Sequence, residues 1–250
     1  NTLQVNGGTF AGGSGGITLT GSTAQLEIDS GTFTSTSGTL EHDGSEFHVD
    51  TGATFNHNNG TVLKNSTGHL DIEAEGGAKT ITLYDLTLNI AGGWSVDVQD
   101  SNTTLVVENT FTRTAGRLDN DTSSTRQIQF QGDIVLDNVS ADTLGTADMV
   151  LTGSNNQTIT LTNTADIDGD FIINKTGGVA SLGSDSNLNN AAYDLYIRNG
   201  SFDAAGNDVA VSGTFEVCGG STNGDCIGGD AGILRLSGDE SSLTTPTLQS

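Results

Sequence analysis

A repeat of about 22 residues, a period typical of solenoid proteins, runs through positions 1–73 and limits the fold more than any other feature of the chain. Three kinds of segment recur there in a fixed order. The first kind ends in Phe10, Phe33 and Phe55, the second contains Gly16, Gly38 and Gly60, and the third covers 25–29, 46–50 and 69–73. Interleaved segments with one common period indicate a solenoid, in which each repeat forms a coil that packs on its neighbours.

The third kind of segment alternates apolar and polar residues, which predicts its inward and outward faces. Leu26, Phe47 and Leu70 would form one inward column, and Ile28, Val49 and Ile72 another. Equivalent strands of successive coils would pair in parallel about 4.8 Å apart. The prediction is an all-β fold, a right-handed parallel β-helix (β-solenoid) with three short strands per coil. The competing interpretation is a β-sandwich with many short strands.

The period weakens after position 73. Short strands are still predicted within 74–165, although their spacing is irregular. The spacing recovers within 166–236, where two sets of apolar residues recur near the period: Phe171, Leu195 and Phe215 form one set, and Leu188, Val209 and Ile233 the other. We therefore expect a single β-helix domain over 1–250 with irregular coils at 74–165.

Composition and charge narrow the class of protein. The chain has 35 Gly but only 1 Pro, which suits short strands joined by tight turns better than disorder. A net charge of -23 argues against nucleic acid as a partner, because phosphate binding needs clustered basic residues. No apolar run is long enough to span a membrane. The chain starts at Asn1 without a signal peptide. We interpret it as a piece of a longer secreted protein.

The two cysteines, Cys218 and Cys226, flank a glycine-rich loop. This spacing predicts a disulfide in an oxidising compartment. Two unrelated thiols are the alternative.

The C-terminal repeats are similar in style to those of a known group of proteins. The segments that carry the likeness are 153–160, 169–179, 194–203 and 208–215, for example Asp194-Leu-Tyr-Ile-Arg-Asn-Gly200-Ser-Phe. They resemble repeats of secreted bacterial β-helical proteins, namely autotransporter passenger regions and filamentous-haemagglutinin-like surface adhesins. The resemblance implies display outside the cell and supplies no catalytic residues.

Two outward columns of the third segment are candidate cation sites. Asp29, Asp50 and Glu73 would stack at the coil spacing, where like charges repel, and Ca²⁺ would relieve that repulsion. Solvated carboxylates that splay apart are the alternative. A second column would hold Glu27, His48 and Asp71, close to the other three histidines, His42, His57 and His69. Imidazole with carboxylate is a sensible metal-binding set, but surface histidines without a ligand are the simpler expectation.

The leading functional hypothesis is a structural or adhesive rod or filament segment, without enzymatic activity and without a cofactor other than possible Ca²⁺. Its expected partners are further copies of the chain, end to end or side by side, and matrix or host glycans. A polysaccharide-binding or polysaccharide-cleaving module is one alternative, with Arg113, Arg117 and Arg126 marking the region to search for a groove. A calcium- or ice-binding adhesin segment is another.

Overall fold

The structure is a computed structural model that describes residues 1–99, 103–120, 128–137, 145, 147–162, 169–188, 194–211, 213–219, 231–235, 237, 243–244 and 247–249. The chain divides into two compact units, 1–128 and 129–250, which we describe separately. The described residues form strands and turns and no helix, so no helix long and apolar enough to cross a membrane occurs among them.

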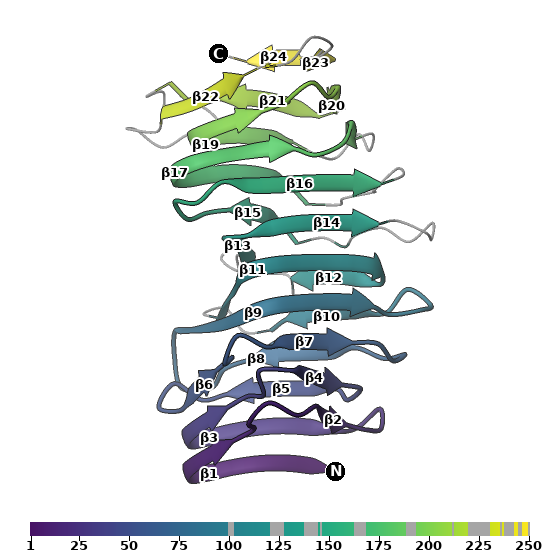
Figure 1. Cartoon of the computed structure of the whole chain (residues 1–250), viewed down its shortest axis with the longest axis vertical. Coiled ribbons are helices and arrows are strands. Elements are labelled where there is room, and N and C mark those ends of the chain that lie inside the picture. The colour runs from purple at the N-terminus through teal and green to yellow at the C-terminus, as the bar shows by residue number, and fades with distance from the viewer. Residues whose placement is uncertain are drawn as a thin grey trace. The chain divides into compact units, whose positions relative to one another are not determined.

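The described part of the first unit contains twelve strands, which Figure 1 draws in purple to teal. They are β1 (Thr2–Ala11), β2 (Ile17–Leu19), β3 (Gln25–Thr34), β4 (Thr39–His42), β5 (Glu46–Val49), β6 (Thr54–Asn56), β7 (Thr61–Lys64), β8 (Leu70–Glu73), β9 (Lys79–Asn89), β10 (Ser95–Val98), β11 (Thr103–Ala115) and β12 (Arg117–Asn120).

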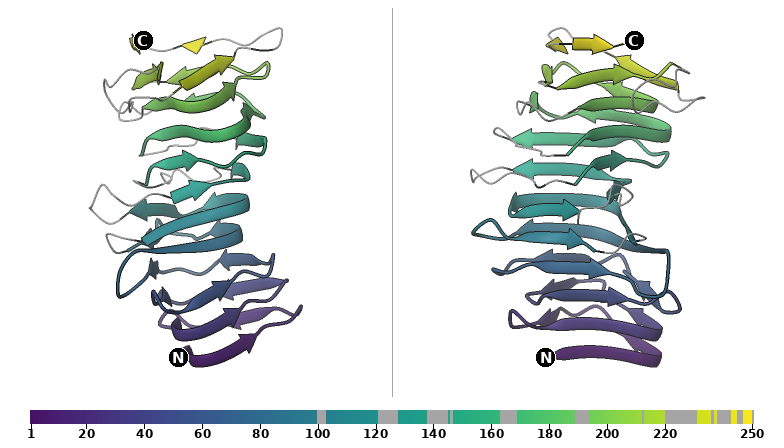
Figure 2. Two further views of the ribbon diagram at one scale, coloured as in Figure 1. Left: turned by 90° about the vertical axis from the view of Figure 1, so that its left-hand side faces the viewer. Right: turned by 180° about the vertical axis from the view of Figure 1, so that it is seen from behind.

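These strands pair coil on coil, and every pairing between named strands of the unit is parallel. One sheet has the order β1-β3-β5-β8-β10-β12, with β6 also paired to β3. The other runs β2-β4-β7-β9-β11 within this unit. Both views in Figure 2 show the coils of this unit lying one upon the next. The parallel β-solenoid expected from the repeat is thus confirmed.

Each coil has the three strand positions that the repeat predicts, and neighbouring positions often join into one longer strand. In β3 the third and first kinds of segment are continuous, and the chain bends at Gly31, which has a φ of 84°. A side chain at Gly31 would also collide with the backbone of Gly8 in the coil before. Glycine is therefore required at this corner.

Aromatic rings stack along the first segments of the three N-terminal coils. Phe10 pairs with Phe33 and Phe33 with Phe55, as the repeat predicts. Their rings stack with centroids 4.7 Å and 5.9 Å apart. Phe33, in the middle, has no exposed surface.

One inward column differs from the prediction. Leu26 lies opposite Phe47, as expected, but Phe47 lies opposite Ile72 and not Leu70. Leu70 is buried and pairs with Val96 of the next coil. The step from β5 to β8 is 25 residues, longer than the 21 residues from β3 to β5. The longer turn moves the register two positions beyond the predicted one, which keeps each apolar side chain inside.

The described part of the second unit contains twelve further strands: β13 (Ile128–Phe130), β14 (Asp133–Asp137), β15 (Met149–Leu151), β16 (Gln157–Thr162), β17 (Phe171–Leu182), β18 (Ser186–Leu188), β19 (Leu195–Asp203), β20 (Val209–Val211), β21 (Thr214–Val217), β22 (Ala231–Arg235), β23 (Leu243–Thr244) and β24 (Thr247–Gln249). β14 pairs with β16, which pairs with the end of β17, and β15 pairs with the start of β17. β19 follows β17 and contacts β21 and β22, while β18, β20 and β23 form a separate sheet.

Phe171, Leu195 and Phe215, the first recurring set, occupy equivalent positions and form an inward column, because the three residues are paired in register and buried. The second recurring set, Leu188, Val209 and Ile233, does not occupy equivalent positions. Val209 lies opposite Ser186 and Leu243, and Ile233 lies opposite Ser201 and is half exposed.

Leu188, Val209 and Ile233 do not align because the coils around β19 differ in length. At the start of β19, Leu195 pairs with Phe215 of β21, whereas further along the strand Asn199 pairs with Ala231 of β22. More residues of the chain therefore separate Asn199 from Ala231 than separate Leu195 from Phe215. Spacing alone therefore could not assign equivalent positions.

Parallel pairing also continues within the segment expected to be irregular. β9 pairs with β11 over most of its length, and β14 pairs with β16 without a shift of register. The parts of 74–165 that the structure describes keep the solenoid backbone even though their side chains no longer follow the N-terminal pattern.

Candidate metal centre

The outer face of β3, β5 and β8 carries most of the chemistry that the structure reveals. Side chains two apart on each strand share this face, and strands of successive coils align them in columns. In one column Glu27 lies opposite His48, and His48 lies opposite Glu73. In the next column Gln25 lies opposite Glu46, and Glu46 lies opposite Asp71.

Both outward columns predicted from the sequence are wrong between β5 and β8. Glu73 was expected beside Asp50, and Asp71 beside His48. The 25-residue step between β5 and β8 instead brings Glu73 to His48 and Asp71 to Glu46. The cause is the register shift that also pairs Phe47 with Ile72. Two residues that the sequence did not single out, Glu46 and Glu75, thereby join the site.

A polar pocket of about 570 Å³ lies over this face. It is lined by side chains from four successive coils: Gln4, Asn6, Glu27, Asp29, Glu46, His48, Asp50, Glu73 and Glu75. Asp29, Asp50 and Glu73, the candidate calcium ligands, all line this pocket, although they do not form one column. Six carboxylates surround a single histidine here, and the pocket therefore favours cations.

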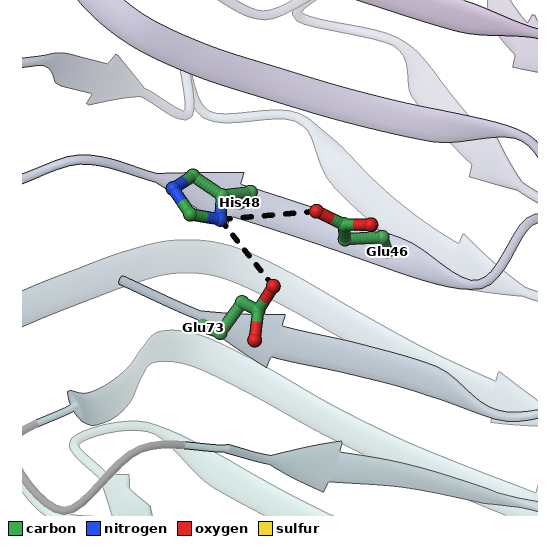
Figure 3. A group of neighbouring side chains, drawn as sticks. All are labelled: Glu46, His48 and Glu73. Atoms are coloured by element: carbon green, nitrogen blue, oxygen red, sulfur yellow. Dashed lines mark hydrogen bonds and ion pairs between the residues drawn. The ribbon is translucent and has the colours of Figure 1, made fainter. Parts of the chain in front are cut away.

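His48 lies at the centre of the carboxylates, as Figure 3 shows for Glu46 and Glu73. The residue is 8% exposed. Its Nε2 lies 2.7 Å from Asp50 Oδ1, and its Nδ1 lies 3.4 Å from Glu73 Oε1 and 3.8 Å from Glu46 Oε1. Burial opposes the charged ring, but hydrogen bonds to Asp50 and Glu73 outweigh it and raise the pKa of His48.

The neighbouring column contains acidic residues in four successive coils. Glu46, Asp71, Asp97 and Asp119 lie opposite one another in that order. Burial, followed by the charge of Asp97, raises the pKa of Asp71. Burial also raises the pKa of Asp97, with a further contribution from Asp119. Basic groups at the edge offset part of this charge, because His69 lies 3.0 Å from Asp97 and Arg117 lies 3.3 Å from Asp119.

The four histidines do not share one environment, contrary to the expectation that all lie at the surface. His42 is fully buried, and its Nδ1 accepts a hydrogen bond from the backbone N–H of Gly44. Burial and the nearby charge of Lys64 lower the pKa of His42 to about 4. His57 contacts Glu108 across two coils, with 3.1 Å between Nε2 and Oε2. Of the four, His48 is the one that lies among several carboxylates in the pocket.

The two described arginines of the region expected to hold a saccharide groove make other contacts. Arg113 is fully buried, and its Nε donates a hydrogen bond to the carbonyl oxygen of Gly116. Its side chain therefore supports a corner of the coil. Arg117 contacts Asp119, and Arg126 lies outside the described residues.

The predicted disulfide stays a prediction, because Cys226 lies outside the described residues. Cys218 is buried, and the residues on either side of the loop meet in an antiparallel bridge between Gly219 and Ala231.

Fold and site together define a parallel β-solenoid with a carboxylate–histidine pocket on its first unit. No family model, curated protein or solved structure matches the chain.

Proposed function

We propose that this chain is a structural segment of an extracellular protein, either at the cell surface or in the matrix. The observation that carries the proposal is the coil-on-coil parallel pairing within each unit, which joins successive coils through continuous backbone hydrogen bonds. Stability in such a fold comes from contacts between neighbouring coils, so the number of coils can set a length.

The surface chemistry is compatible with this role. The net charge of -23 keeps a protein soluble at neutral pH. Outward positions also carry hydrogen-bonded polar ladders, such as Asn65 and Asn89, whose side chains are 2.9 Å apart. These ladders join coils on the outside as the apolar columns do on the inside. Adhesion to glycans and association between copies belong to the same proposal.

Immunogold electron microscopy of the source cells tests the location. Antibodies against the purified chain should label the outside of intact cells or the material between them. Label that is confined to the cell interior, and accessible only after permeabilisation, would refute the proposal.

Removal of one coil tests the structural role. Deletion of 39–60 removes one repeat and brings β7 to the place of β4, because Thr39 and Thr61 are register partners. The shortened chain should fold and unfold cooperatively, with a lower denaturant midpoint. Loss of all β-structure would show that the coils are not equivalent building units.

A further inference from the structure

We propose that His48 Nδ1, Glu46 and Glu73 form a binding site for a divalent cation of the zinc type. The three side chains come from two successive coils, since Glu46 and His48 are two apart on β5 and Glu73 lies opposite His48 on β8. One ligand atom from each lies within 4.8 Å of the others. The inference does not depend on the extracellular role proposed above.

The hydrogen bonding of the His48 ring distinguishes this site from a simple cluster of acidic side chains. A carboxylate only accepts hydrogen bonds, so the 2.7 Å contact with Asp50 Oδ1 requires the proton on Nε2. Nδ1 faces the oxygens of Glu73 and Glu46, and a cation that binds there displaces the second ring proton and takes the Nδ1 lone pair. Three electron-pair donors therefore converge on one point, where a cation satisfies all three.

Asp50 has the position of an outer partner in such a site. Histidines that bind metals nearly always donate the other ring N–H to a carboxylate or carbonyl, which fixes the ring and makes it a better ligand. His48 has this arrangement, with Asp50 on the side opposite Glu46 and Glu73. Burial of the His48 side chain, which is 10% exposed, holds the ring in place, while the carboxylates line the open pocket.

The donor set favours zinc over the calcium expected from the sequence. Zinc commonly takes four ligands from imidazole nitrogen and carboxylate oxygen, at about 2.0–2.2 Å. Calcium takes six to eight oxygen ligands and gains little from an imidazole. One nitrogen, two carboxylates and a water from the pocket complete a four-coordinate zinc site.

Isothermal titration of the whole chain with zinc chloride, in buffer at physiological salt, tests the proposal. We expect one saturable site that an equal concentration of calcium chloride does not occupy. His48→Gln should abolish binding, and Glu73→Gln or Glu46→Gln should weaken it by at least about tenfold. Asp50→Asn should weaken binding by about 10- to 100-fold, as outer-partner changes do.

His69→Gln and Asp29→Asn are matched controls. His69 directly precedes β8 and has one carboxylate contact, Asp97, and Asp29 lines the pocket outside the ligand set. Both variants should bind zinc like the parent. Circular dichroism checks the fold of each variant, and the half-exposed Glu73 provides the decisive variant if His48→Gln fails to fold. The proposal is overturned by no saturable binding, by unchanged affinity in Glu73→Gln, by an equal loss in Asp29→Asn, or by displacement of zinc by equimolar calcium.

Discussion

His48 in β5 and Glu73 in β8 lie directly opposite each other in successive coils, with 3.4 Å between Nδ1 and Oε1. This pairing defines both the pocket and the register of the apolar columns behind it. The same two-residue shift that places Glu73 beside His48 places Ile72 behind it, opposite Phe47.

The stacked phenylalanines should contribute strongly to the stability of the first unit. Phe33 lies between Phe10 and Phe55 and is fully buried. We expect Phe33→Ala to lower the free energy of unfolding by about 3–5 kcal/mol, because it leaves a cavity between two rings. Phe10→Ala should cost less, since Phe10 is only half-buried. Urea unfolding measures both, and equal losses would contradict the stacked arrangement.

A glycine at a coil corner should resist substitution. A Cβ on Gly44 would collide with the carbonyl oxygen of Ala24 in the preceding coil. We expect Gly44→Ala to destabilise the protein by about 1–3 kcal/mol or more, because backbone must move. Gly52→Ala is the control, because nothing lies within 4 Å of its Cβ position, and its effect should stay within about 0.5 kcal/mol. Thermal unfolding compares the two, and an equally small effect at Gly44 would count against the coil spacing.

His42 should make the first unit sensitive to acid. Burial and Lys64 hold the pKa of His42 at about 4, below the ordinary value of 6.5. A lowered histidine pKa means that the unfolded state binds the proton more readily, so stability falls as pH decreases from 6.5 to 4. The loss from this residue approaches about 3 kcal/mol at the acid end.

His42→Gln isolates this effect, because the glutamine side-chain oxygen can accept the hydrogen bond from Gly44. Denaturant unfolding at pH 7.5 and pH 4.5 should show a smaller acid-induced loss in the variant than in the parent. Identical losses would mean that His42 is not the residue responsible.

The acidic column should destabilise the protein at neutral pH. Burial and then the charge of Asp119 raise the pKa of Asp97, so ionised Asp97 costs stability, and that cost disappears as pH falls through the raised pKa. We expect Asp97→Asn to stabilise the chain at pH 7 by about 0.5–1 kcal/mol, the scale of cross-strand charge pairs. The gain should shrink in acid when urea unfolding is repeated. A gain that is independent of pH would point to packing as the cause.

The sequence predicts the fold well where apolar residues recur at a constant step. Phe10, Phe33 and Phe55 meet this condition, and their pairing follows from the period alone. The pattern fails where a turn gains or loses residues, because strand side chains alternate with a period of two. A two-residue change then leaves the same faces inside and exchanges the partners, as it does for Leu70 and Ile72.

Unpredictable turn lengths also limit the prediction of the polar site. His48 and Glu73 are both outward residues by alternation, but only the length of the turn before β8 decides that they meet. Buried polar groups are harder still to predict. Lys64 is fully buried because its ammonium donates hydrogen bonds to the carbonyl oxygens of Asp43 and Gly44 in the coil before. The residue type alone suggests an exposed position.

Disulfide cross-linking of paired positions tests the central claim most directly. Residues that are directly opposite in neighbouring strands are close enough for a disulfide, whereas positions offset by two are generally too far apart. His48→Cys combined with Glu73→Cys should therefore form an intramolecular disulfide on mild oxidation, detected by mass spectrometry after proteolysis. His48→Cys combined with Asp71→Cys should not. Cross-linking of 48 to 71 in preference to 73 would contradict the register, and with it the pocket and the zinc site.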